Sequence, residues 1–228
     1  MAVAILFGVF FVFLLLGVPV AFALVPSSLA TVLYLGMPSV VVVLQTAAGA
    51  GSASLIAIPL FVFAGELMMR GGISDRLIAF AAALVGKAKG GLAQINVVAS
   101  LFFGGVSGSA IADVSAIGGT MIPQMINRGY RRDFAVNASI SAALVALLVP
   151  PSHNLILYSA SAGGSISIAD LFAAGILPAL LLTAAVMITS RIIAGRHGYA
   201  AEGFPGLQAV LLRLVAALPG LLLVALYA

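Results

Sequence analysis

The sequence contains no cysteine and no tryptophan, and only 7% of its 228 residues are charged. Without cysteine, the chain can form neither a disulfide framework nor a thiolate metal site. A soluble domain carries about 25% charged residues, so the shortage of charge argues against a soluble fold. Hydrophobic residues make up 63% of the chain, which is typical of a protein with several membrane spans. We therefore predict an all-α polytopic membrane protein, embedded in a lipid bilayer.

Long apolar runs, separated by short clusters of Gly, Pro and Ser, mark the expected spans. About 20 apolar residues cross the hydrocarbon core of a bilayer. Runs of this kind occupy residues 3–25, 29–48, 55–69, 134–160, 171–194 and 207–228. The first boundary falls at Pro26-Ser27-Ser28, so residues 1–72 are expected to hold three scaffold-like spans. The first run lacks the charged segment of a cleaved signal and is expected to be retained.

A shorter apolar run covers residues 73–86 and has charged residues at both ends. A helix of this length reaches only about 21 Å at 1.5 Å per residue. That is too short for a hydrocarbon core of about 30 Å. We therefore predict that residues 73–89 form an arm helix that lies in the membrane interface.

Residues 90–126 are apolar but are interrupted midway by a Gly/Ser-rich break. Lys and Arg collect on the cytoplasmic side of a membrane. A single crossing would separate Lys87 and Lys89 from Arg128, Arg131 and Arg132, whereas a segment that enters and returns keeps both groups on one side. We therefore predict a re-entrant helical hairpin over residues 90–127 and a periplasmic N-terminus. Residues 133–196 then hold a broken span and the span that follows it.

The break reads Gly104-Gly105-Val106-Ser107-Gly108-Ser109. In hydrocarbon, irregular backbone survives only where it is buried in protein or lines a cavity. A polar, flexible tip at that depth therefore indicates a binding site. The candidate ion ligands in this tip are Gly105, Val106, Ser107, Gly108 and Ser109.

A second break, Pro150-Pro151-Ser152-His153-Asn154, lies midway along the run at residues 134–160. Each proline lacks a backbone N–H and clashes with the carbonyl four residues earlier, so we expect the helix to unwind. Carbonyl, hydroxyl and amide oxygens are hard ligands, which suit Na⁺ rather than a transition metal. The candidate ion ligands here are Ala146, Leu147, Pro150 and Ser152. The candidates for a substrate carboxylate are Ser107, Ser109, Asn96, Asp113, His153 and Asn154.

Five motifs, in this order, resemble the large membrane subunit of TRAP (tripartite ATP-independent periplasmic) transporters. They occupy residues 58–68, 90–93, 102–113, 150–152 and 168–178. The resemblance implies an elevator-type, sodium-coupled importer of carboxylate-bearing solutes, such as C4-dicarboxylates or sugar acids, in the bacterial inner membrane. It implies a small membrane subunit and a periplasmic solute-binding protein as partners. We expect no nucleic acid partner, no cofactor other than Na⁺ as coupling ion, and no enzymatic activity.

Members of this family carry two inverted repeats, each with its own hairpin and broken helix. The sequence shows one such set, so the chain resembles the N-terminal half. Residues 204–228 are then expected to be the start of a second repeat. The pair His153-Asn154 departs from the family, in which an aliphatic residue often follows Pro-Pro-Ser, and it leaves the solute class open.

Structural roles compete with the functional ones at the hairpin tip. Ser107 and Ser109 are small residues that suit close packing between membrane helices. Ser109 also suits the N-cap of the outgoing arm. Asp113 falls in the first turn of that arm, where the helix dipole favours a carboxylate.

Other polar residues carry the same ambiguity. Asn96 suits either a hydrogen bond across helices or a place at the site. His153 suits a hydrogen-bonded position in the unwound segment. Glu66 stands four residues before Arg70, the order that favours an ion pair on one helix face, so a salt bridge is preferred there to a proton relay.

Three other functions match parts of the sequence less well. Gly105-Val106-Ser107-Gly108 matches the Gly-x-Ser-Gly pattern of rhomboid-like intramembrane serine proteases, with His153 as base. That match is four residues long, and a double proline beside the base would spoil its geometry. A channel lacks support, because the sequence has no ring of charges or pore-lining repeat. An ion-coupled anion carrier that needs no binding protein is the alternative within transport.

Overall fold

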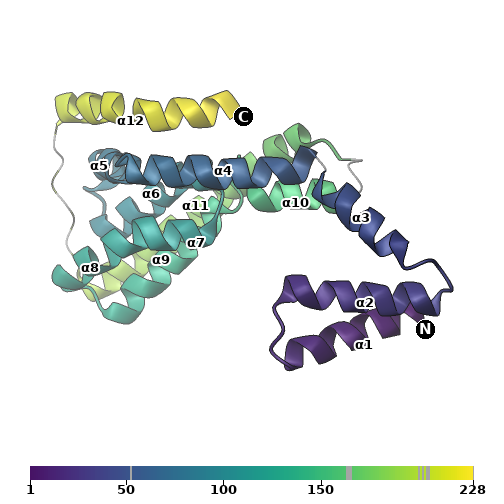
Figure 1. Cartoon of the computed structure of the whole chain (residues 1–228). Coiled ribbons are helices and arrows are strands. Elements are labelled where there is room, and N and C mark those ends of the chain that lie inside the picture. The colour runs from purple at the N-terminus through teal and green to yellow at the C-terminus, as the bar shows by residue number, and fades with distance from the viewer. Residues whose placement is uncertain (52, 163–165, 200, 202, 204–205, 228) are drawn as a thin grey trace. The chain divides into compact units, whose positions relative to one another are not determined.

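The computed structural model describes residues 1–51, 53–162, 166–199, 201, 203 and 206–227 (Figure 1). These residues form helices and the turns between them, with no strand among them. The chain divides into two compact units, Met1–Ile56 and Ala57–Ala228. The prediction of an all-helical protein is confirmed for the described part of the chain.

The first unit holds helices α1 (Ala2–Leu15), α2 (Val20–Tyr34) and α3 (Val40–Ala50). Helix α1 packs along α2, and α2 contacts α3. On α2, Ala23 and Ser27 are both fully buried. Because they stand four residues apart, they lie on one helix face, and small residues at this spacing let membrane helices approach closely.

The first turn of the chain lies earlier than the sequence predicts. Helix α1 ends at Leu15, and the chain reverses through Gly17, whose φ is 79°, to Pro19 at the start of α2. The expected boundary at Pro26 is wrong, because this proline lies inside α2. A glycine in the left-handed region followed by a proline is a stronger helix end than a proline alone. Residues 1–72 accordingly hold four helices, with α4 (Ala53–Arg70) as the fourth.

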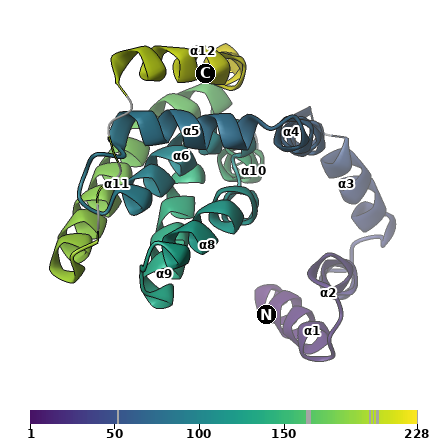
Figure 2. The ribbon, with the colours of Figure 1, turned by 90° about the vertical axis from the view of Figure 1, so that its left-hand side faces the viewer.

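The second unit is built around one buried helix. Every residue of α6 (Gly91–Ser107) is buried except Leu101 and Phe102. Around α6 pack α5 (Ile73–Val85), α7 (Ala110–Asp113), the π-helical turn η1 (Val114–Gly118), α8 (Gly119–Asn127), α9 (Arg132–Ala146), α11 (Ile168–His197) and α12 (Leu207–Tyr227). Helix α10 (His153–Ser161) follows α9 and contacts α11. Helix α12 packs against α5 and is drawn above it in both ribbon views (Figures 1 and 2).

Polar side chains on α6 join it to its neighbours. The amide of Gln94 donates to the backbone oxygen of Met187 on α11, at 3.0 Å. The amide of Asn96 donates to the hydroxyl oxygen of Ser139 on α9, at 2.8 Å. These bonds fix the rotation of α6, because each needs one particular helix face to meet one particular neighbour.

Length and composition identify one described helix that could cross a membrane alone. This is α11, whose 30 residues extend about 45 Å at 1.5 Å per residue. Five other apolar helices are shorter, namely Ala2–Leu15, Val20–Tyr34, Val40–Ala50, Gly91–Ser107 and Leu207–Leu222. The predicted arm segment forms α5, and its buried residues Leu77, Phe80 and Ala81 belong to the core around α6.

Candidate functional site

The predicted tip is the turn between α6 and α7. Helix α6 ends at Ser107, and Gly108 takes a left-handed conformation with φ of 55°. Its N–H donates to the carbonyl of Gly104 at 2.8 Å. The side chain of Ser109 then accepts from the N–H of Ala112 at 3.4 Å, which makes it the N-cap of the outgoing segment. The predicted capping role of Ser109 is therefore confirmed.

The second break is the segment between α9 and α10. Helix α9 ends at Ala146 and α10 begins at His153. Pro150 has no N–H, so it cannot satisfy the carbonyl of Ala146 four residues before it. The hydroxyl of Ser152 donates to the carbonyl of Leu147 at 2.6 Å. The backbone of this segment is thus held partly by a side chain rather than by a continuous helix.

The two breaks meet in space. A Cβ atom on Gly108 would collide with the carbonyl oxygen of Pro151 and would stand 3.0 Å from Cα of Ser152. Four residues earlier, a Cβ on Gly104 would stand 2.6 Å from Cα of Ala146. Because these contacts are with backbone, the neighbours cannot yield by turning a side chain. Glycine at these two positions is what lets α6 and its tip approach the broken helix.

Neutral oxygens gather where the breaks meet. The last carbonyls of a helix have no partner within it, and at the end of α6 only that of Gly104 is used by the capping bond. The carbonyls of Gly105, Val106 and Ser107 follow it. The hydroxyl of Ser107 lies 3.4 Å from the N–H of Ser109. The arrangement can therefore offer carbonyl and hydroxyl oxygens to a hard cation, without a carboxylate.

Two predicted substrate residues lie further along the hairpin. Asn96 precedes Ser107 by eleven positions, about 16 Å along the helix, and its amide bonds to Ser139. Asp113 accepts a hydrogen bond from the hydroxyl of Ser100 at 2.7 Å. Each keeps one buried oxygen, Oδ1, without a hydrogen-bond partner among the described residues. Asn96 thus joins α6 to α9, and Asp113, four residues after Ser109, joins α7 to α6.

The residues after the double proline differ in exposure. His153 is the first residue of α10, and its Nε2 atom is buried with no hydrogen-bond partner in the described part of the chain. The side chain of Asn154 is exposed. The Ser107 hydroxyl contacts Ser109 instead of His153. The hydrogen bond between nucleophile and base that a serine protease requires is therefore not formed among these residues.

The structure adds glycines that the sequence did not single out as site residues. A Cβ on Gly175 of α11 would stand 2.7 Å from the carbonyl oxygen of Leu148, within the second break. A Cβ on Gly65 of α4 would stand 3.7 Å from the carbonyl oxygen of Val106. Both glycines lie in motifs that carry the resemblance, at residues 168–178 and 58–68. Their place in these motifs is the only sequence signal that could have identified them as site residues. How closely two backbones approach depends on tertiary packing, which the sequence does not show.

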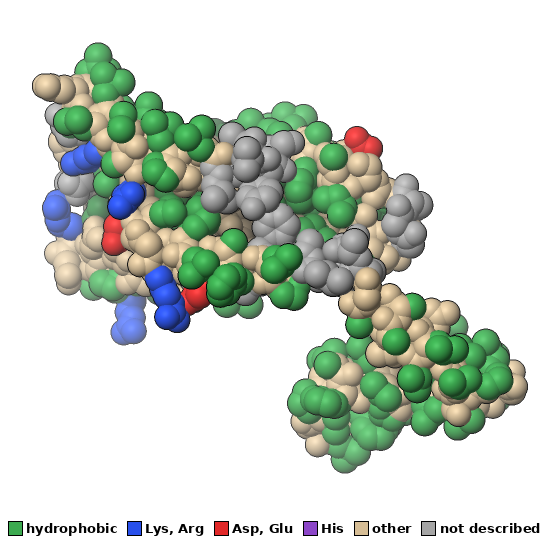
Figure 3. Space-filling view, turned by 45° about the horizontal axis from the view of Figure 1, so that its top comes forward, with side chains coloured by type: hydrophobic (Ala, Val, Ile, Leu, Met, Phe, Trp, Pro, Cys, Tyr) green, Lys and Arg blue, Asp and Glu red, His purple; other side chains and the backbone are tan. Residues whose placement is uncertain are grey.

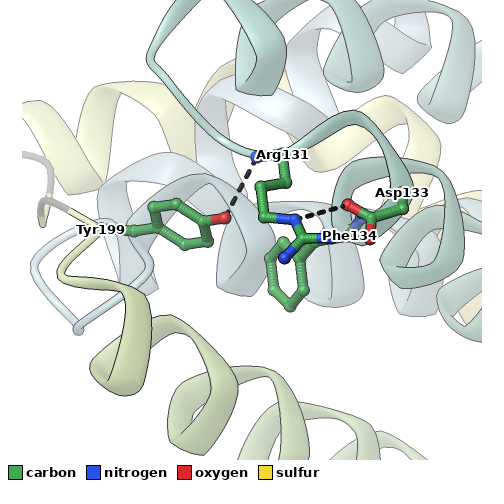
Figure 4. Close-up of polar contacts among 4 residues, drawn as sticks. All are labelled: Arg131, Asp133, Phe134 and Tyr199. Carbon is green, nitrogen blue, oxygen red and sulfur yellow. Dashed lines mark hydrogen bonds and ion pairs between the residues drawn. The ribbon is translucent and has the colours of Figure 1, made fainter.

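Basic side chains gather at one end of the second unit (Figure 3). There the backbone N–H of Arg131 donates to the hydroxyl oxygen of Tyr199, which follows α11, at 3.0 Å (Figure 4). The guanidinium of Arg131 pairs with Asp133 at 2.7 Å and lowers the pKa of that carboxyl. The ring of Tyr130 stacks on Tyr199 with centroids 4.1 Å apart. These contacts join the turn between α8 and α9 to the end of α11.

Comparison with known proteins supports one family. Residues 7–227 match the model of the tripartite ATP-independent periplasmic transporter, DctM component. An uncharacterized protein, YgiK of Salmonella typhimurium, is 40% identical over 225 residues, which are 97% of this chain and 52% of that protein. The C4-dicarboxylate TRAP transporter large permease protein DctM of Vibrio cholerae is 40% identical over 198 residues, with 84% of this chain and 43% of that protein covered.

The relatives differ in the solutes that their names state. The sialic acid TRAP transporter large permease protein SiaM of Vibrio cholerae is 37% identical over 184 residues, or 80% of this chain and 43% of that protein. The chain spans about half the length of the curated relatives it matches. The family consists of integral membrane permeases, which are not enzymes. The chain belongs to the DctM family, the large permease components of tripartite ATP-independent periplasmic transporters.

Proposed function

We propose that this chain forms part of a sodium-coupled secondary transporter that imports small carboxylate-bearing solutes. The observation that carries the proposal is the contact between the two helix breaks, at Gly108 and Pro151. In an integral membrane protein, irregular backbone is tolerated where it lines a site. Transporters bind ions and substrates where helices are interrupted, and here two interruptions face each other.

The oxygens around this contact suit Na⁺. The carbonyls of Gly105, Val106 and Ser107 come from the tip, and those of Ala146 and Leu147 come from the second break. Pro150 contributes by leaving the Ala146 carbonyl without an N–H donor. All of these ligands are hard and neutral, so they fit a monovalent hard cation better than a transition metal.

A substrate carboxylate would lie beside this ion. The hydroxyls of Ser107 and Ser109 and the N–H groups that open the outgoing segment are the donors nearest to the tip. Relatives are named for C4-dicarboxylate, 2,3-diketo-L-gulonate and sialic acid, each of which carries a carboxylate. Another relative is named for isethionate, whose acid group is a sulfonate, so an acidic group is what these solutes share. His153 and Asn154 stand next to the break and are proposed to influence which solute is accepted.

The proposed transport cycle is of the elevator type. The hairpin of residues 90–127 would be re-entrant and would move together with α9 and α10, because the backbone contacts between Gly104, Gly108 and the second break join them. The scaffold would remain in the bacterial inner membrane with the N-terminus periplasmic. A periplasmic solute-binding protein would deliver the solute, and a small membrane subunit would complete the permease. Each inward Na⁺ would contribute about 2.3 kcal/mol per 100 mV.

Sodium dependence of uptake tests the ion site. The intact transporter is reconstituted in liposomes as wild type, as the Pro150→Ala/Pro151→Ala variant and as the control Pro123→Ala. Pro123 is exposed and lies inside α8, fourteen residues after Ser109, so the control removes a proline that belongs to neither break. The double variant should need at least several-fold more Na⁺ for half-maximal uptake, whereas the control should match wild type. Unchanged sodium activation in the double variant would contradict the proposal.

Delivery by a binding protein is tested separately. Uptake is measured in the same liposomes with and without the periplasmic binding protein. Loss of uptake on omission supports the three-component arrangement. Full uptake without it would favour the alternative of an ion-coupled anion carrier that binds its solute directly.

A further inference from the structure

A polar cavity lies at the basic end of the second unit, apart from the two helix breaks. It has a volume of about 250 Å³ and is lined by residues of α5, α6, α8 and α12 and by Gly203. The residues that line it are Ile78, Ala82, Leu92, Ile95, Met121, Gln124, Arg128, Gly203 and Arg213. One water occupies about 30 Å³ of liquid, so the space can accept a group much larger than a single water.

The polar side of this cavity is cationic. Arg128 follows the last residue of α8, and Arg213 projects from α12. One nitrogen of the Arg213 guanidinium donates to the carbonyl of Ala79 on α5, at 3.2 Å. A guanidinium has five N–H donors, so others remain for a ligand. No carboxylate among the described residues pairs with Arg213. With the amide of Gln124 beside them, these groups suit an anionic, oxygen-rich ligand such as a phosphate.

The other side of the cavity is apolar. Leu92, Ile95 and Met121 are buried, and Ile78 and Ala82 on α5 are partly exposed beside them. Gln124 and Arg128 are exposed. A soluble anion would gain nothing from such an apolar wall, whereas a lipid can place its phosphate at the arginines and its glycerol and first acyl carbons against α5 and α6.

If residues 90–127 are re-entrant, as proposed, the cavity lies at the membrane surface, at the level of the phospholipid headgroups. It is bounded by the start of α6 and the end of α8, the two ends of the hairpin arms that carry the basic clusters. In an integral membrane protein, basic clusters of this kind lie next to the membrane surface. Basic pockets between helices on that side bind phospholipid headgroups.

We propose that this cavity is a binding site for one anionic phospholipid, held by Arg213 and the amide of Gln124, with Arg128 adding positive charge beside them. Because the lipid would touch the arm helix α5, both hairpin arms and α12 at once, its binding would tie the hairpin to those two helices. The inference rests on the proposed re-entrant arrangement of residues 90–127 in an integral membrane protein. It does not depend on sodium coupling or on the identity of the solute.

The test is lipid binding to the purified intact protein, measured by native mass spectrometry. Phosphatidylglycerol and phosphatidylcholine are each titrated into wild type and the variant Arg213→Gln. The control is Arg196→Gln, which removes the same charge from the last turn of α11, outside the cavity. A basic residue near an anionic membrane surface contributes enough for about a fivefold change in affinity. We expect Arg213→Gln to bind phosphatidylglycerol about fivefold more weakly, and Arg196→Gln to bind it as wild type does.

Two further variants separate lipid binding from damage to the fold. Arg213→Lys keeps the charge and should retain most of the preference for phosphatidylglycerol. Ala82→Phe fills the apolar side without changing charge and should weaken binding of the lipid. Equal binding of the two lipids by wild type, or equal losses in Arg213→Gln and Arg196→Gln, would overturn the proposal. Displacement of the lipid by glycerol phosphate at similar concentration would overturn it in favour of a soluble anion.

Discussion

At the scale of single residues, glycine decides how closely the two breaks approach. Gly108 needs both its left-handed φ of 55° and its missing side chain, because the Pro151 carbonyl occupies the place of a Cβ. Gly119, eleven residues away in α8, has nothing within 4 Å of such an atom. Comparing a substitution at Gly108 with one at Gly119 therefore distinguishes the effect of close backbone approach from the general effect of replacing a glycine.

The substitution Gly108→Ala is expected to lower stability and to weaken Na⁺ binding together. A left-handed conformation costs a non-glycine residue about 1–2 kcal/mol, and the collision with Pro151 adds to this. Thermal unfolding of the purified protein is measured with and without Na⁺, because a bound ligand raises the unfolding temperature. Gly119→Ala should keep the stabilisation by Na⁺ that wild type shows. If Gly108→Ala keeps it as well, the tip does not form the ion site.

The ion pair between Arg131 and Asp133 gives a second prediction at this scale. The guanidinium holds the pKa of Asp133 below its ordinary value of 3.8. A carboxyl with a lowered pKa in the folded state stabilises the fold above its unfolded pKa, and this contribution disappears as the pH falls through the lowered value. Both side chains are exposed, so the effect is small.

The measurement is the difference in unfolding temperature between wild type and Asp133→Asn. We expect this difference to be present at neutral pH and to shrink as the pH falls through and below the ordinary range of a carboxyl. Asp170→Asn is the control, since Asp170 is not within reach of Arg131. A difference between wild type and Asp133→Asn that is the same at both ends of the pH range would show that the ion pair does not contribute.

At the scale of elements, α6 is held in place by polar contacts inside an apolar core. The bond between Asn96 and Ser139 joins α6 to α9 and is fully buried. Hydrogen bonds between membrane helices contribute about 0.6 kcal/mol on average and at most about 1.7 kcal/mol. Because Asn96 already has one unpaired oxygen, removing its remaining partner leaves the whole amide unsatisfied.

Ser139→Ala should therefore destabilise the protein by about 1–2 kcal/mol. The matched control is Ser115→Ala, which removes a hydroxyl that is exposed and bonds only to Ile111 in its own helical segment. Both variants are compared by unfolding in increasing denaturing detergent. Equal stability of the two variants would mean that the bond between α6 and α9 is not significant.

Local sequence signals predicted several features of these elements. The Ser109 cap and the ion pair of Glu66 with Arg70, at 3.0 Å, are confirmed. Both contacts join residues three or four positions apart, so the rules for helix capping and for ion pairs on one helix face are sufficient to predict them. The first turn lies at Gly17 and not at the predicted boundary Pro26, because a glycine in the left-handed region ends a helix. In α2, Pro26 removes one hydrogen bond, and the helix continues on both sides of it.

Contacts between elements that are distant in the chain could not be predicted from the sequence. The approach of Gly175 to Leu148, and that of Gly104 to Ala146, depend on how α11 and α6 pack against the second break. The partner of Asp113 is Ser100, and no spacing rule connects two residues on opposite arms of a hairpin. The sequence could therefore indicate which segments are interrupted, but not that the interruptions touch each other.

At the scale of the whole molecule, the distribution of charge predicts how the chain crosses the membrane. If residues 90–127 are re-entrant, both ends of this segment face the cytoplasm. If the segment crosses once, the ends face opposite sides. The start of α6 and the end of α8 line one cavity, which favours the re-entrant arrangement, and an accessibility measurement tests it.

The absence of cysteine from this sequence makes labelling a direct measurement. Single variants Lys89→Cys, Arg128→Cys and Ser161→Cys are treated in intact cells and in inverted membrane vesicles with a maleimide that does not cross membranes. A re-entrant hairpin predicts that the first two variants react only in vesicles, because their thiols face the cytoplasm. Ser161→Cys, at the end of α10, should react in intact cells. Labelling of the first two variants from opposite sides would establish a single crossing, and the Gly/Ser-rich break would then lie within a spanning helix rather than at the tip of a hairpin.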